Sequence, residues 1–146
     1  MDSADDIGDI LFICGRNTSR SKLAEAFALS SGLSASSCGL TITEAEITAS
    51  STTINPRAIT ALSSNYSINI PLPAPRSIDA LLNQQSYDHV ILLCDCLQPS
   101  DSNKVLQLSR KNSYEIWNIV KPSHTKNGFE VACKQIRGEM GKLGWL

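Results

Sequence analysis

The chain has 146 residues, 42% of them hydrophobic, and a formal net charge of −1. This size and composition predict one globular domain over residues 1–146, and the balanced charge gives no electrostatic basis for binding nucleic acid or a membrane surface. The first six residues are acidic, the wrong sign for a signal peptide, and no apolar run has the length of a bilayer span, so we expect a cytoplasmic protein. Five cysteines, an odd number without metal-type spacing, favour reduced thiols, and we expect neither a metal nor a cofactor.

A buried strand, a polar loop and a helix are predicted near the N-terminus. The apolar run Ile10–Cys14 has the length of a buried strand, and residues 21–30 have a helical pattern. Cys14 therefore lies where a strand meets a helix N-terminus, and the backbone N–H groups of Gly15 to Arg20 can surround the oxygens of an anion. The Arg20 guanidinium adds a bidentate donor, and the same positive field favours the thiolate form of Cys14. This loop predicts a nucleophile beside an anion-binding site.

Strand and helix patterns alternate along the rest of the chain. This order predicts an α/β fold, a parallel sheet with helices on both faces, in which ligands bind beyond the carboxyl ends of the strands. We expect Glu44 and Glu46 to be solvated, and an apolar stripe from Phe129 to Leu143 to lie in the core. The predicted elements are a strand over 34–40, a loop over 41–54, a helix opened by Asn55 and Pro56, an extended proline-rich segment over 71–75, a short helix over 78–82 capped by Ser77, a strand over 88–94, a helix over 100–110, a strand over 114–119 and a last helix over 129–143.

The string Cys14-Gly-Arg-Asn-Thr-Ser-Arg-Ser21, followed by Leu23-Ala-Glu-Ala26, resembles the active-site loop of low-molecular-weight protein tyrosine phosphatases. It is similar also to that of thioredoxin-coupled arsenate reductases, which share the fold. The resemblance implies a three-layer, doubly wound, four-stranded parallel sheet in strand order 2-1-3-4, with a phosphate-binding loop after the first strand. It further implies that Cys14 is the nucleophile, that Arg20 binds the transition state, and that the phosphate-binding loop comprises Gly15, Arg16, Asn17, Thr18, Ser19 and Ser21, with Asn17 and Ser21 holding its shape and the Ser21 hydroxyl donating to the thiolate.

One position departs from the family pattern, in which an aspartate directly before a proline is the general acid. Here Lys121 precedes Pro122. Lysine stays protonated at neutral pH, and loss of a general acid costs roughly 10² to 10⁴ in rate. We therefore expect weak turnover of phosphotyrosine esters, with less loss for acidic leaving groups. His124, Asp95 and Asp101 are alternative acids.

Three functions fit the sequence. The first is hydrolysis of a phosphate-bearing substrate, either a phosphotyrosine protein or a small phosphomonoester. The second is arsenate reduction: Cys94 matches a reductase cysteine at the end of the third strand, although the further resolving cysteine is missing near residues 100–101 and Cys96 would have to serve. The third is binding of phosphate or a phosphopeptide with little turnover. We favour the first, and the sequence leaves the oligomeric state open.

Overall fold

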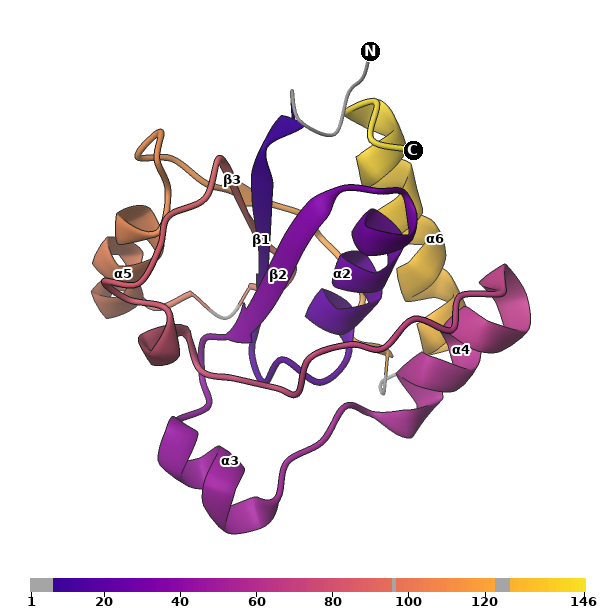
Figure 1. The fold of residues 1–146 in the computed structure, drawn as a ribbon, viewed down its shortest axis with the longest axis horizontal. Coiled ribbons are helices and arrows are strands. Elements are labelled where there is room, and N and C mark those ends of the chain that lie inside the picture. The colour runs from indigo at the N-terminus through magenta and orange to yellow at the C-terminus, as the bar shows by residue number, and fades with distance from the viewer. Residues whose placement is uncertain (1–6, 96, 123–126) are drawn as a thin grey trace.

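The computed structural model describes residues 7–95, 97–122 and 127–146. They form a four-stranded parallel sheet in the order β2-β1-β3-β4, which confirms the predicted α/β class and strand order (Figure 1). The strands are β1 (Asp9–Cys14), β2 (Ser34–Gly39), β3 (His89–Leu92) and β4 (Glu115–Ile116), and the helices are α2 (Arg20–Ser30), α3 (Glu44–Ser50), α4 (Pro56–Tyr66), α5 (Ser102–Gln107) and α6 (Gly128–Lys142), with short 3₁₀ turns at Ile78–Ala80 and Pro99–Asp101.

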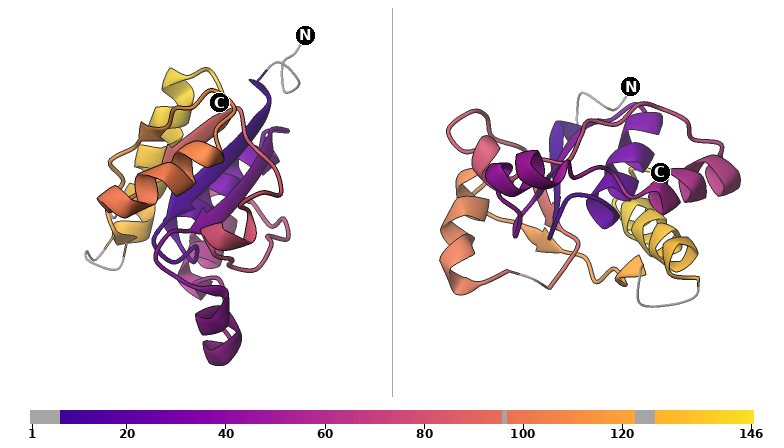
Figure 2. Two further views of the ribbon diagram at one scale, coloured as in Figure 1. Left: turned by 90° about the vertical axis from the view of Figure 1, so that its left-hand side faces the viewer. Right: turned by 90° about the horizontal axis from the view of Figure 1, so that it is seen from below.

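Strand β1 forms the centre of the sheet because its side chains are apolar on both faces. Ile10, Phe12 and Cys14 pack in one cluster with α2, α4 and α6, whereas Leu11 and Ile13 pack in a second cluster that includes residues of α5. Figure 2 shows these layers, with α5 on one side of the sheet and α2 and α6 on the other. Within the described part of the chain, no helix is long and apolar enough to cross a bilayer.

The segment predicted as a loop over residues 41–54 contains α3, so that prediction was wrong. A reciprocal capping box stabilises the N-terminus of this helix: Thr43 Oγ1 accepts from the Glu46 N–H at 3.1 Å, and Glu46 Oε1 accepts from the Thr43 N–H at 3.2 Å. The helix buries no residue, so it has no apolar periodicity to reveal it. Glu44 is not merely solvated either, because its carboxylate accepts a hydrogen bond from the Ser77 N–H at 2.6 Å.

Strand β4 is much shorter than the predicted strand over residues 114–119. It pairs with β3 only through Glu115 and Ile116, and both residues are exposed at the edge of the sheet. After Trp117 the backbone turns, with the Ile119 N–H donating to the Trp117 carbonyl at 3.0 Å. The apolar side chains that suggested a longer strand therefore belong to a segment that leaves the sheet. The stripe on α6 is buried as expected except for Leu143, which is 42% exposed.

We expect the Asp88→Asn variant to lose about 1 kcal/mol of stability at neutral pH. The Asp9 N–H, at 2.8 Å, and the Arg110 guanidinium, at 2.7 Å, hold the pKa of the Asp88 carboxyl below its ordinary value. A lowered carboxyl pKa stabilises the fold above the pKa of the unfolded chain, and this stabilisation is lost as the pH falls through the folded value. Urea unfolding should therefore give a lower free energy of unfolding for Asp88→Asn than for the wild type at about pH 7, and equal values at about pH 2. An equal difference at both pH values would contradict the assignment.

Candidate active site around Cys14

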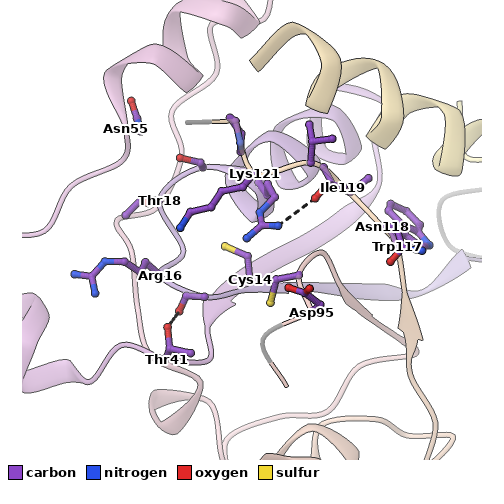
Figure 3. A pocket seen from close by; sticks show the side chains of 16 residues that line it. Cys14, Arg16, Thr18, Thr41, Asn55, Asp95, Trp117, Asn118, Ile119 and Lys121 are labelled. Carbon is purple, nitrogen blue, oxygen red and sulfur yellow. Dashed lines mark hydrogen bonds between the residues drawn. The ribbon is translucent and has the colours of Figure 1, made fainter. Parts of the chain in front are cut away.

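A cavity of about 870 Å³ lies beyond the carboxyl ends of β1, β3 and β4 (Figure 3). This is the edge of a parallel sheet at which ligands bind in doubly wound folds. Three segments that are far apart in sequence meet there, together with Thr41 and Asn55. The lining residues are Cys14, Gly15, Arg16, Thr18, Ser19 and Arg20 from the loop after β1, Cys94 and Asp95 after β3, and Trp117, Asn118, Ile119, Val120, Lys121 and Pro122 after β4.

The carbonyl groups of the loop between Cys14 and Arg20 accept hydrogen bonds from neighbouring segments of the chain. The Cys14 carbonyl accepts from the Leu40 N–H at 2.8 Å, the Gly15 carbonyl from the Thr41 N–H at 2.9 Å, and the Thr18 carbonyl from the Asn55 N–H at 3.0 Å. These bonds leave backbone donors, not acceptors, available to a ligand.

Three of those donors lack an acceptor. Within the described residues, the backbone N–H groups of Arg16, Thr18 and Ser19 make no hydrogen bond, and all three residues line the cavity. Unpaired N–H groups beside the N-terminus of a helix bind anions favourably. The loop therefore has the polarity of an oxyanion site.

The Cys14 side chain lies at the base of the cavity and is only 4% exposed. Its Sγ lies 2.9 Å from Ser21 Oγ and accepts from the Asn17 N–H at 3.3 Å. These two contacts fix the position of the sulfur at the start of the loop.

Asn17 gives the loop its shape. Its φ of 61° is in the left-handed region, which asparagine tolerates better than most residues, and its side chain is fully buried. The Asn17 Nδ2 donates to Ser21 Oγ and to Ser37 Oγ, both at 2.8 Å, and its Oδ1 accepts from the Arg76 N–H at 3.0 Å. One amide thus joins the loop to α2, β2 and the segment before Ser77.

Arg20 connects the loop to the opposite rim. Its Nη1 donates to the Ile119 carbonyl at 3.1 Å, which fixes the guanidinium beside the cavity and leaves its other N–H groups for a ligand. The rim is itself held to α6, because the Val120 N–H donates to Gln135 Oε1 at 2.8 Å. Gly128 permits this packing, since a Cβ there would lie 1.9 Å from the Pro122 carbonyl oxygen.

The charges lining the cavity are mostly positive. Arg16, Arg20 and Lys121 carry positive charge, and Asp95 is the only carboxylate among the described lining residues. Figure 3 shows the Lys121 side chain reaching across the mouth toward the Cys14 loop, whereas Arg16 points away and Asp95 lies on the other side of Cys14. We expect such a cavity to bind anions.

The remaining predicted site residues have different positions. Cys94 is buried and lines the cavity with Cys14, and it is disulfide-bonded, so the prediction that all cysteines are reduced thiols was wrong for this residue. Cys96 and His124 lie outside the described residues. Asp101 does not line the cavity; its carboxylate accepts from the Gln98 N–H at 3.2 Å in a 3₁₀ turn. Among the described residues, no cluster of three histidines, cysteines or carboxylates could hold a metal ion.

Several residues of the site carry no signal that sequence reasoning could use. Thr41, Asn55 and Trp117 reach the cavity only because separate segments converge there. Ser37 and Arg76 contact Asn17 from other parts of the chain, and a polar residue on a strand or an arginine after a proline is unremarkable in the sequence.

Comparison of the sequence with protein-family models and with curated proteins finds no match. Solved structures are similar over most of the chain. An arsenate reductase in the phosphate binding state is 26% identical, with a TM-score of 0.68 over 92% of this chain and 95% of that one. A low-molecular-weight phosphotyrosine phosphatase from Vibrio cholerae O395 is 15% identical, with a TM-score of 0.67 over 94% of each chain. The chain therefore has the fold of the low-molecular-weight phosphatase and arsenate reductase family.

This finding confirms the resemblance inferred from the Cys14 loop. Wzb of Vibrio vulnificus, solved in complex with benzylphosphonate, also has the family fold, at 13% identity and a TM-score of 0.62 over 93% of this chain and 99% of that one. Because phosphatases and reductases share the fold, the choice between these activities depends on the residues of the cavity.

We expect the Gly39→Ala variant to lose about 1 to 3 kcal/mol of stability and to slow alkylation of Cys14. A Cβ at Gly39 would lie 2.9 Å from the Gly15 carbonyl oxygen and 2.7 Å from Ile42 Cγ2, so the backbone of the loop must shift. Urea unfolding and iodoacetamide labelling measure the two effects. The matched control is Gly138→Ala on α6, where a Cβ meets open space and about 0.4 to 1 kcal/mol should be gained. Equal behaviour of the two variants would contradict the steric argument.

Proposed function

We propose that the chain is a phosphomonoester hydrolase that forms a cysteinyl-phosphate on Cys14. The observation that carries this proposal is the position of Cys14 Sγ. It lies at the base of a cationic cavity, next to loop N–H groups that have no acceptor among the described residues. A nucleophile surrounded by donors for oxyanions is what phosphoryl transfer requires, since its catalysis is mostly positioning and charge stabilisation.

The first chemical step transfers the phosphoryl group to sulfur. The Cys14 thiolate attacks phosphorus in line with the leaving oxygen, the S–P bond forms, and the P–O bond to the alcohol breaks. Arg20, positioned by the Ile119 carbonyl, binds two equatorial oxygens with its free N–H groups. In the second step water attacks phosphorus, the S–P bond breaks, and inorganic phosphate leaves while the Cys14 thiolate is restored.

The leaving oxygen needs a proton, and Lys121 occupies the family's position for the acid. Its ammonium stabilises negative charge on that oxygen but is a poor general base at neutral pH. Asp95 is the one carboxylate among the described residues that line the cavity, so it is the residue there that could replace the missing general acid. We therefore propose a slow hydrolase that acts best on esters with acidic leaving groups, in the cytoplasm, where thiols are kept reduced.

We expect Cys14→Ser to abolish hydrolysis of p-nitrophenyl phosphate and of phenyl phosphate. We expect Lys121→Asp to raise the rate for phenyl phosphate by roughly 10², because this poor leaving group depends most on an acid, and to raise that for p-nitrophenyl phosphate less. Steady-state rates measured across pH give both results.

The control is Lys121→Met, which removes the charge without supplying an acid and should not accelerate phenyl phosphate hydrolysis. Equal rates for the wild type and Cys14→Ser would contradict the proposed nucleophile. Tight binding of inorganic phosphate with no hydrolysis by any variant would favour a phosphate or phosphopeptide binding protein.

Arsenate reduction is the second candidate, favoured by one observation: Cys94 lines the same cavity as Cys14. Arsenate would first form an adduct with the Cys14 sulfur. Cys94 is disulfide-bonded in the structure, so thioredoxin must first reduce it to a thiol. Attack of that thiol on the Cys14 sulfur would then transfer two electrons to arsenic, release arsenite and leave a protein disulfide for thioredoxin to reduce.

We expect this second candidate, if correct, to produce arsenate-dependent oxidation of reduced thioredoxin that is lost in Cys94→Ser. Cys133→Ser is the control, because Cys133 is buried in the core at α6 and does not line the cavity. Absence of thioredoxin oxidation at every arsenate concentration would exclude reduction.

A further inference from the structure

A buried ion pair lies next to the Cys14 loop and has no part in the chemistry described above. Lys22 and Glu25, one helical turn apart on α2, are each 1% exposed, and Lys22 Nζ lies 3.1 Å from Glu25 Oε1. A buried ion pair is weak support for stability, because desolvation offsets much of its attraction. The groups that this ion pair contacts therefore indicate its role better than its contribution to stability does.

The pair is connected to the nucleophile by hydrogen bonds whose directions can be assigned. The Arg76 backbone N–H can only donate, so the Asn17 atom that it contacts at 3.0 Å is the amide oxygen. The Asn17 NH₂ group then donates its two hydrogens to Ser21 Oγ and Ser37 Oγ, each at 2.8 Å. Both serine oxygens are acceptors in these bonds, so each must give its own proton to another group.

Each serine has one acceptor left. The Ser37 hydroxyl lies 2.5 Å from Glu25 Oε1 and donates to it, since an ionised carboxylate only accepts. The Ser21 hydroxyl lies 2.9 Å from Cys14 Sγ and donates to it when Cys14 is the thiolate nucleophile proposed above, because a thiolate only accepts. A complete set of donors and acceptors thus runs from the ion pair to the thiol.

We propose that Lys22 is a positioning residue for the Cys14 nucleophile and that it acts through Glu25. The ammonium fixes Glu25 Oε1 from 3.1 Å, and the same oxygen accepts the Ser37 proton at 2.5 Å. This inference rests on the nucleophilic role proposed for Cys14.

Loss of the ammonium would disturb the whole set of bonds. Without the ammonium, Glu25 Oε1 loses the partner that fixes its position, and the Ser37 hydroxyl loses the acceptor that sets its direction. Asn17 would then hold Ser21 less firmly, and the Ser21 hydroxyl would lose its fixed direction toward sulfur. Lys22 therefore affects the nucleophile through the directions of the Ser37 and Ser21 hydroxyl protons.

Burial outweighs the Glu25 carboxylate at Lys22, so the pKa of its ammonium is lower than the ordinary lysine value. Burial lowers the pKa of the Lys22 ammonium, Glu25 raises it, and the Arg76 guanidinium lowers it again, while Cys14 raises it slightly. Cys38 on β2 is the other titratable group nearby, and burial raises the pKa of its thiol so far that it stays neutral. On the cavity side the charged groups are Arg16, Arg20, Lys121 and Asp95.

The test is the pH dependence of Cys14 alkylation by iodoacetamide, followed by mass spectrometry of the Cys14 peptide. We expect Lys22→Met to raise the pH midpoint by about one unit, the size of one charge-assisted hydrogen bond. The control is Lys134→Met, which removes the lysine of an exposed pair with Glu130 and should leave the midpoint unchanged. An unchanged midpoint in Lys22→Met would overturn the inference.

A double variant separates proton direction from a direct electrostatic effect of the ammonium on sulfur. In Lys22→Met with Glu25→Gln, the Gln amide oxygen accepts from Ser37 without needing a counter-charge, so we expect the midpoint to return to the wild-type value. If it stays raised, Lys22 acts by its field alone and the inference is overturned.

Ser37→Ala keeps the ion pair and removes the connection, and it serves if Lys22→Met does not fold. The inference predicts a raised midpoint in this variant, and an unchanged one would overturn it. Because alkylation requires no turnover, these outcomes are independent of the proposed hydrolysis, which fails if no variant hydrolyses the esters or if Cys14→Ser leaves the phosphatase activity intact.

Discussion

The buried amide of Asn17 is the interaction on which the rest of the site depends. Its oxygen and both of its N–H groups are used, and its backbone has the left-handed conformation that turns the loop after β1. Through this one side chain, α2, β2 and the segment before Ser77 all constrain the position of Cys14. Precise placement of a nucleophile is worth several orders of magnitude in rate, so a rigid frame of this kind is a functional feature.

The cavity combines this rigid frame with an unusual balance of charge. Three cationic side chains and one carboxylate are among the described residues that line it, and Lys121 lies on its rim directly before Pro122. For the hydrolase that we propose, positive charge would favour capture of a dianion and stabilise the equatorial oxygens in the transition state, while slow protonation of the leaving group would limit turnover. The same charges would serve arsenate equally well, since its shape and charge match those of phosphate.

Prediction from sequence succeeded where all the residues that define a feature are adjacent in the chain. Ile10–Cys14 is apolar on both faces because β1 is central, and the Cys14 loop is continuous, so both are readable without a fold. It failed for α3, whose capping box is local but which buries no residue, and for the strand ending at Ile119, whose apolar residues line a cavity after the chain leaves the sheet. Hydrophobic periodicity reports burial, and it cannot tell burial in a sheet from burial at a rim.

By itself the sequence determined the α/β class and the strand-loop-helix unit with Cys14 and Arg20, because local periodicity and residue chemistry are properties of adjacent residues. Only the tertiary structure decided which distant groups meet that unit. Ser37, Arg76 and the rim after Trp117 are brought to the loop by the strand order and by packing on α6. The directions of the hydrogen bonds to the Cys14 sulfur follow from those contacts, since a donor has meaning only when its acceptor is in place.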